Sequence, residues 1–408
     1  MAQAISFERS QALYRAACDM IPGGAHRGGT PLLDPGHSPI YFERGRGCRI
    51  WDVDGNEYID YILAYGAILL GYADEAVDGA AMAQVARGKL LTLNHPLHLR
   101  FIEAILRRFP AADMAFPAKT GSEATTAALR IARRFTGRRK IVRCGFHGWH
   151  DWCFPEDESV PMGLAEQVLD LRDITPEGLS ALLTPHAGEV AAVIVAPEMV
   201  QPLTRGAIQS LIDTAHQHGA LFILDEVKTG LRMPGGSVQQ YLTVKPDMTA
   251  LSKALGNGWP VAAVIGRHEV MQAGQDIYLS ATFHGETAGM AAALMTLEII
   301  DREGVQDHIW AMGERLIDGL NAIVARHQLP ARAYGEPLPP MPFLAFTHAD
   351  QAVNEALRTT FYSEMFKRGI LLHPRHLWYT ARAHTAADIE RTLAAADEAM
   401  AIARAQLI

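Results

Sequence analysis

The polarity pattern of the first 60 residues predicts one helix followed by small antiparallel strands. Residues 6–21 carry apolar side chains at helical spacing. Residues 22–39 are rich in glycine and proline and are expected to form a loop. The segments 40–45 and 48–60 are predicted strands, with a tight turn at Asp54-Gly55 because glycine accepts a positive φ. The expected buried face of the helix consists of Phe7, Leu13, Tyr14, Ala17 and Ile21.

From about residue 74 to residue 300, short apolar runs alternate with helical patterns. Continuously apolar strands joined by helices are typical of a parallel sheet that is covered on both faces. The sequence therefore predicts an α/β fold with a mostly parallel sheet. The strand candidates are residues 114–116, 140–143, 190–196, 221–224, 248–251 and 261–265.

After residue 300 the pattern changes again, with a strand at 343–347 and helices at 352–368 and 386–406. This arrangement predicts a smaller, separate α+β unit, in keeping with about two or three domains for a chain of 408 residues. We expect residues 1–60 to be an N-terminal segment belonging to the small domain. Residues 61–300 are expected to form the large domain, and residues 301–408 the rest of the small domain.

The charge and composition of the chain limit the classes of partner that it can bind. The net charge is −8 and no basic run is present, which argues against nucleic acid and against an anionic membrane surface. No apolar run approaches the ~20 residues that cross a bilayer, and no signal peptide is expected. The four cysteines have no metal-ligand spacing, so we expect reduced thiols, no metal and a cytoplasmic protein.

Two charged side chains at predicted strand ends indicate a reactive site. Asp225 ends the apolar run 220–224, and Lys253 lies between another apolar strand and a glycine-rich turn. Burial there would lower the pKa of the lysine amine and favour nucleophilic attack. Alone, Asp225 could be a strand-end cap and Lys253 a surface lysine. Together they suit pyridoxal 5'-phosphate, with the lysine forming a Schiff base and the aspartate keeping the pyridine nitrogen protonated.

Two further stretches could contact such a cofactor. Gly121 and Ser122 begin a predicted helix, whose free N–H groups and dipole suit a phosphate. A plain helix cap is the alternative for this stretch. Phe146 and His147 follow a predicted strand within Gly145-Phe146-His147-Gly148, where an aromatic ring can stack on a flat ligand. Core or interface packing is the competing interpretation for these aromatic residues.

These residues together resemble the class III pyridoxal-phosphate aminotransferases. The resemblance is strongest to the branch that contains glutamate-1-semialdehyde aminomutase and the β-amino-acid aminotransferases, and it runs from about residue 20 to the last helix. It implies a pyridoxal-phosphate-dependent transferase of fold type I. The motifs that carry it are Asp52-x-Asp54-Gly55, Gly121-Ser122-Glu123, Phe146-His147-Gly148, Asp225-Glu226-Val227, Ser252-Lys253 and Thr282.

The resemblance implies an aminotransferase that moves an amino group between an amine or amino acid and a carbonyl acceptor. β-Amino acids are among the candidate donors. Lys253 would form the Schiff base and then carry the proton between the substrate carbon and the cofactor. Asp225 would pair with the pyridinium nitrogen.

The same resemblance implies contacts around the cofactor. Val227 would pack on one face of its ring and Phe146 on the other, where the family more often has tyrosine. His147 belongs to the same aromatic motif and is expected beside the cofactor. Gly121 and Ser122 would hold the phosphate.

The roles expected for three further residues rest on the resemblance alone. Thr282 matches the threonine that reaches the phosphate of the neighbouring subunit, which implies a homodimer with shared active sites; a simple strand-forming residue is the alternative. Arg27 matches an arginine that holds the substrate carboxylate, although a solvated loop arginine fits as well. Tyr65 falls where the family lines its substrate pocket, with core packing as the alternative.

Departures from the aminomutase pattern favour plain amino transfer. The segment 154–163 is shorter than the mobile loop of the aminomutase, and an isomerase must retain its intermediate behind such a lid. The segment 373–380 lacks the glutamate expected in an aminomutase. Glu198-Met199 also stands where the family usually has Glu-Pro. An aminomutase-type isomerase that moves the amino group within one molecule is the alternative function.

Overall fold

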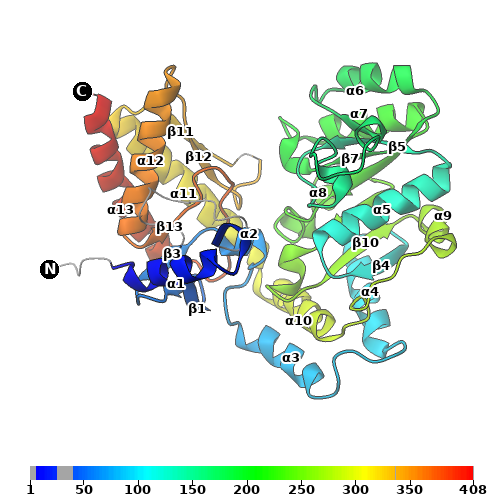
Figure 1. The fold of residues 1–408 in the computed structure, drawn as a ribbon, viewed down its shortest axis with the longest axis horizontal. Coiled ribbons are helices and arrows are strands. Elements are labelled where there is room, and N and C mark those ends of the chain that lie inside the picture. The colour runs from blue at the N-terminus through cyan, green and yellow to red at the C-terminus, as the bar shows by residue number, and fades with distance from the viewer. Residues whose placement is uncertain (1–5, 25–39, 336, 408) are drawn as a thin grey trace. The chain divides into compact units, whose positions relative to one another are not determined.

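A computed structural model describes residues 6–24, 40–335 and 337–407. The chain divides into two compact units (Figure 1). The small unit combines residues 1–74 with residues 307–408, and the large unit comprises residues 75–306. Within the described residues, no helix has both the length and the apolar character needed to cross a membrane. No cluster of three or more metal-binding side chains occurs among them either.

The large unit contains a seven-stranded sheet with the order β4-β10-β9-β8-β7-β5-β6. Only β10 runs against its neighbours, β9 and β4, so the sheet is mostly parallel, as the sequence predicts. Every residue of β7, β8, β9 and β10 is buried, which accounts for their unbroken apolar sequences. The strands are β4 (Met114–Ala118), β5 (Lys140–Cys144), β6 (Val168–Asp170), β7 (Val190–Val195), β8 (Leu221–Asp225), β9 (Met248–Leu251) and β10 (Ala262–Gly266).

Helix α5 (Gly121–Thr136) packs across the large sheet and contacts β7, β9 and β10 (Figure 1). Its sheet-facing side chains are buried, whereas Phe135 in the last turn is exposed. The other helices of this unit are α3 (Glu75–Val85), α4 (Pro96–Arg108), α6 (Pro176–Leu183), α7 (Arg205–Gln217), α8 (Val238–Tyr241), α9 (His268–Met271) and α10 (Ala288–Glu303).

The small unit joins the two ends of the chain in one sheet. Its order is β1 (Phe42–Arg46), β2 (Arg49–Asp52), β3 (Glu57–Asp60) and β13 (Ile370–Leu371). The first three strands are antiparallel, as predicted, whereas β13 pairs parallel to β3. The predicted N-terminal helix is α1 (Glu8–Cys18); Phe7 and Ala17 are buried, but Leu13 and Ile21 are exposed.

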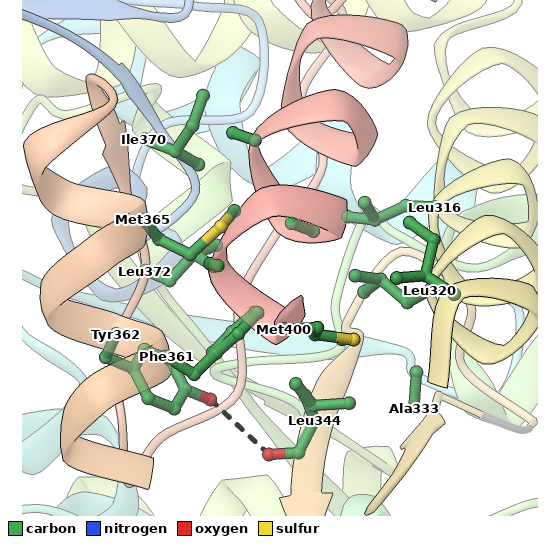
Figure 2. Packing of buried hydrophobic residues seen from close by; sticks show 14 of the residues in the cluster. Leu316, Leu320, Ala333, Leu344, Phe361, Tyr362, Met365, Ile370, Leu372 and Met400 are labelled. Atoms are coloured by element: carbon green, nitrogen blue, oxygen red, sulfur yellow. Dashed lines mark hydrogen bonds between the residues drawn. The ribbon is translucent and has the colours of Figure 1, made fainter. Parts of the chain in front are cut away.

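Three helices and a second hairpin build the core of the small unit. The helices are α11 (Val305–His327), α12 (Gln351–Lys367) and α13 (Ala386–Arg404), and the hairpin joins β11 (Ala331–Tyr334) to β12 (Phe343–Phe346). Figure 2 shows that this core is almost wholly apolar, with the Tyr362 hydroxyl donating to the Leu344 carbonyl at 3.4 Å. Side chains from all three helices meet there: Leu316, Leu320, Phe361, Tyr362, Met365 and Met400.

Candidate active site

The candidate site lies where neighbouring strands of the large sheet end. Strands β8 and β9 are adjacent and parallel, with Asp225 paired in register with Ala250. Their carboxyl ends therefore meet at one edge, where ligands bind in open α/β sheets. Asp225 is the last residue of β8, and Lys253 begins the 3₁₀ helix η7 (Lys253–Gly256) just after β9.

A single pocket brings together most of the residues predicted from the sequence. Lys253 and Asp225 both line it. The other predicted lining residues are Gly121, Ser122, Phe146, His147 and Val227. Gly148, Ala196, Glu198 and Lys228 complete the wall. Segments that follow β4, β5, β7, β8 and β9 thus converge on one cavity.

Asp225 is held rigidly in the wall of this pocket. Its side chain is buried, and its Oδ1 accepts a hydrogen bond from the N–H of Val227 at 3.0 Å. Its Oδ2 lies 2.7 Å from Nδ1 of His147. An ionised carboxylate can only accept, so Nδ1 of His147 carries the proton of this bond. The carboxylate is therefore fixed by two donors before any ligand arrives.

His147 is itself fixed by the elements around it. Its carbonyl accepts from the Thr125 hydroxyl at 2.8 Å, and its ring stacks on Trp152 with centroids 5.8 Å apart. These contacts tie the segment after β5 to helix α5. His147 therefore acts on Asp225 from a fixed position.

The start of α5 offers a site for an anion. Thr120 and Glu123 form a capping box, in which the Thr120 hydroxyl accepts from the N–H of Glu123 at 3.2 Å. This leaves the N–H groups of Gly121 and Ser122 at the positive end of the helix. A Cβ at Gly121 would lie 2.8 Å from Cγ1 of Val227, so this close approach requires glycine.

Lys253 is set up as a nucleophile. Its backbone has a φ of 48°, in the left-handed region that a lysine seldom adopts, and such strain is common at functional sites. Burial is the largest cause that lowers the pKa of its amine, and the Lys228 cation adds to the effect. Together they bring the pKa from 10.5 to about 7, while Glu198 and Asp225 act in the opposite direction. A large share of the amine is thus uncharged near neutral pH.

Glu226 follows Asp225 directly after β8 but lies inside the fold. It is fully buried and accepts from the N–H groups of Val238 and Gln239, at 2.7 and 3.2 Å, where α8 begins. Burial raises its pKa to about 7. Glu226 does not line the pocket and serves as an anchor inside the fold.

The structure adds two charged pocket residues that the sequence analysis did not assign. Lys228 and Glu198 both line the cavity and form an ion pair with Nζ and Oε1 2.6 Å apart. A signal was present in the sequence, because Lys228 directly follows Asp225-Glu226-Val227. Glu198 also follows the predicted strand at 190–196.

Two predicted residues do not line this pocket, and the structure does not describe a third. Thr282 is exposed in a turn before α10 and does not line the pocket. Tyr65 belongs to the small unit, where its ring meets the rings of His376 and His373 edge-on, with centroids 5.2 and 5.7 Å apart. Arg27 lies outside the described residues.

Comparison with known proteins identifies the family. The model of the class III aminotransferases matches residues 33–376. The chain belongs to the class III aminotransferases. It is a pyridoxal-phosphate-dependent aminotransferase, as the motifs predict.

Relatives of this aminotransferase are similar over nearly their whole length. It is 33% identical to the 3-aminobutyryl-CoA aminotransferase of Cloacimonas acidaminovorans, over 98% of this chain and 99% of the relative. It is 32% identical to the glutamate-1-semialdehyde 2,1-aminomutase of Archaeoglobus fulgidus, over 97% and 100%. The solved FumI protein of Sphingopyxis sp. MTA144, which contains pyridoxal phosphate, superposes with a TM-score of 0.91 and 30% identity, covering 98% and 97% of the two chains.

The pocket of this aminotransferase fits pyridoxal phosphate chemically. An anion-binding helix start, a buried carboxylate and a buried amine of low pKa face one cavity, which matches the phosphate, the ring nitrogen and the aldehyde of the cofactor. Phe146 and Val227 supply apolar surface for the ring between these polar groups. A side chain at Gly121 would collide with Val227, so the helix start requires glycine at this position.

Proposed function

We propose that Lys253 and Asp225 are the catalytic residues of amino transfer between an amine or amino acid and a carbonyl acceptor. The observation that carries this proposal is that both side chains line one pocket at the ends of adjacent parallel strands. When bound, the cofactor links covalently to a lysine amine and withdraws electrons from the carbon that bears the amino group.

The residues of the chain then have distinct tasks. Lys253 attacks as the uncharged amine and afterwards carries the proton to and from the substrate carbon. Asp225 stays ionised to bind the protonated ring nitrogen, and the bond from His147 keeps its carboxylate in place. The N–H groups of Gly121 and Ser122 and the hydroxyl of Ser122 hold the phosphate.

We also propose that Phe146 and Val227 hold the ring of the cofactor. Val227 packs against Gly121 in the pocket wall, and a Cβ on that glycine would collide with it. Phe146 also lines the pocket and is exposed, so an aromatic face is available for stacking.

The proposed donors are β-amino carboxylates or their derivatives. The relative from Cloacimonas acidaminovorans is named for an acid derivative with its amino group on carbon 3. We propose Arg27 as the partner of a substrate carboxylate, since a guanidinium binds carboxylates through paired hydrogen bonds. Tyr65 is proposed as a further substrate contact.

We propose that the enzyme is a cytoplasmic homodimer whose subunits share their active sites. Thr282 is exposed in its turn, so a neighbouring subunit could receive it. Large apolar side chains of the large unit are also exposed, among them Leu93 and Leu99, as expected at an interface. Four free thiols support the proposed compartment.

The cofactor site is tested by absorbance. We expect the purified protein with pyridoxal phosphate to show a band near ~420 nm, the usual position for a cofactor bound to a lysine. Lys253→Ala should lose the band and all transfer activity, while a panel of amine donors should bleach it in the wild type. A wild type that binds the cofactor without any such band would reject Lys253 as the attachment point.

An aminomutase is the second candidate, because several relatives carry that name at about the same identity. It predicts conversion of glutamate-1-semialdehyde without a separate carbonyl acceptor. Transfer that requires an added acceptor supports the aminotransferase, and acceptor-free turnover supports the isomerase.

A further inference from the structure

The ion pair between Glu198 and Lys228 is built into the wall of the candidate active site. Glu198 belongs to a short 3₁₀ helix after β7, and Lys228 follows Val227 after β8. The Lys228 ammonium lies 2.6 Å from Oε1 of Glu198, and the two side chains are only 14% and 8% exposed. Both line the same cavity as Lys253.

Stability is a poor explanation for this pair. Two buried charges lose hydration, and replacing such pairs with apolar residues is often neutral or stabilising. Moreover, Oε2 of Glu198 is buried without a hydrogen-bond partner among the described residues. Lys228 has its ammonium 5.8 Å from the centre of the Phe146 ring, at the proposed stacking residue. The pair therefore costs hydration and places two charges beside the reactive amine.

The surroundings of Lys253 show what these charges can do. Lys228 and Arg232 oppose a positive charge on the Lys253 amine, whereas Glu198 and Asp225 favour it. Burial opposes the charge most strongly and lowers the pKa of the amine to about 7. His147 also lines the pocket, but it is bonded to Asp225. Among the charged groups that act on the Lys253 amine, Lys228 has the largest effect on its pKa and Glu198 the second largest.

We propose that Glu198 and Lys228 are positioning residues whose opposite charges set the protonation state of the Lys253 nitrogen, an inference that rests on the function proposed above. Glu198 holds the Lys228 ammonium in the pocket wall, where the like charge keeps Lys253 uncharged and nucleophilic. The carboxylate also offsets part of that repulsion, so the nitrogen can still take up a proton during transfer. The two residues thus act in opposite directions on one nitrogen.

Opposite shifts in a pH titration test this arrangement. The pH midpoint of the cofactor band near ~420 nm reports protonation of the nitrogen that Lys253 contributes. Lys228→Met should move the midpoint to higher pH, and Glu198→Gln should move it to lower pH, each by on the order of one pH unit. The double variant, which leaves no unpaired buried charge, should lie between them. Lys228→Arg keeps the charge and should stay near the wild-type midpoint.

Lys140→Met is the matched control. Lys140 is also ion-paired, with Glu189 at 2.7 Å, but it lies at the start of β5, the opposite edge of the sheet. Its removal should leave the midpoint unchanged. Shifts of the same sign for Lys228→Met and Glu198→Gln, or no shift in either, would overturn the inference while a normal band upholds the proposed function. Absence of the band in the wild type would reject the proposed function, and the inference with it.

Discussion

At the scale of single residues, two neighbouring carboxylates have different surroundings. Asp225 lines the pocket and is bonded to His147, while Glu226 is buried in the fold and anchors the start of α8. Successive side chains of a strand point to opposite faces, and the chain keeps this alternation just past the end of β8. The pocket position and the structural position are thus divided between two adjacent residues, Asp225 and Glu226.

Asp225→Asn should lower kcat by on the order of 10²-fold, because it removes the charge opposite the ring nitrogen. The fold should be retained, since an amide has nearly the same shape. The matched variant Glu226→Gln should behave in the reverse way. Its amide N–H group would face backbone donors, so the free energy of unfolding should fall by about 1–3 kcal/mol with kcat little changed. Steady-state kinetics and thermal unfolding separate the two outcomes; equal losses of kcat would contradict the division.

The pKa of Lys253 gives a second expectation at this scale. Only the uncharged amine can attack the cofactor, and its pKa of about 7 means that this form increases as pH rises through neutrality. The rate at which cofactor-free protein captures pyridoxal phosphate should therefore be half-maximal near pH 7 and level off about one pH unit above it. Stopped-flow absorbance near ~420 nm measures this rate. A rate that keeps rising towards pH ~10 would indicate an ordinary, solvated lysine.

At the scale of elements, the sequence predicts what local polarity controls. All six strands expected in the large unit occur; β7, β8, β9 and β10 are buried throughout, and β4 and β5 only in part. Strands β6, β11 and β13 are absent from the predictions, since they have only three, four and two residues and depend on a partner strand. The same limit applies to Leu13 and Ile21, whose exposure is decided by packing that a helical repeat does not contain.

The short helix α2 (Leu63–Gly66) is another element that no local pattern reveals. Leu63, Ala64, Tyr65 and Gly66 all have positive φ, at 48°, 51°, 58° and 84°. The carboxylate of Asp60 accepts from the N–H groups of Ile62 and Leu63 just before and at its start. This left-handed turn fixes the backbone that carries Tyr65.

Two substitutions in this turn should have opposite effects. Ala64 is exposed, so Ala64→Gly loses no packing and should raise the free energy of unfolding by about 1 kcal/mol by relieving the left-handed backbone. Gly66→Ala should lower it by more, because the new Cβ would lie 2.7 Å from the Tyr379 ring. Thermal unfolding measures both; a stabilising Gly66→Ala would mean that the turn is not required.

At the scale of the whole molecule, the predicted site is only partly contained in the large unit. Seven of the predicted residues line one pocket, because they follow strands whose ends converge in a parallel sheet. Thr282 and Tyr65 do not, and no hydrophobic repeat could have placed them, because such a repeat reports only the buried face of its own element. Lys228 and Glu198 went unassigned for a similar reason, because their pairing joins two separate segments.

Mixed dimers test whether the subunits share their sites. Thr282→Glu would place a negative charge against the phosphate of the partner and should weaken cofactor binding. Lys253→Ala should be inactive. When the two variants are dissociated and reassociated together, each hybrid dimer regains one site with both native residues, so activity should return. If the mixture stays as inactive as its components, Thr282 does not serve a neighbouring subunit.

The pairing of β13 with β3 has a consequence for the growing polypeptide. Ile59 leaves the ribosome long before Ile370, its neighbour in the small sheet. At synthesis rates of about 5–20 residues per second, the outer edge of β3 stays uncovered for on the order of 15–60 s. Throughout that interval the nascent chain presents an open strand edge, so chaperones have a defined early target in this protein.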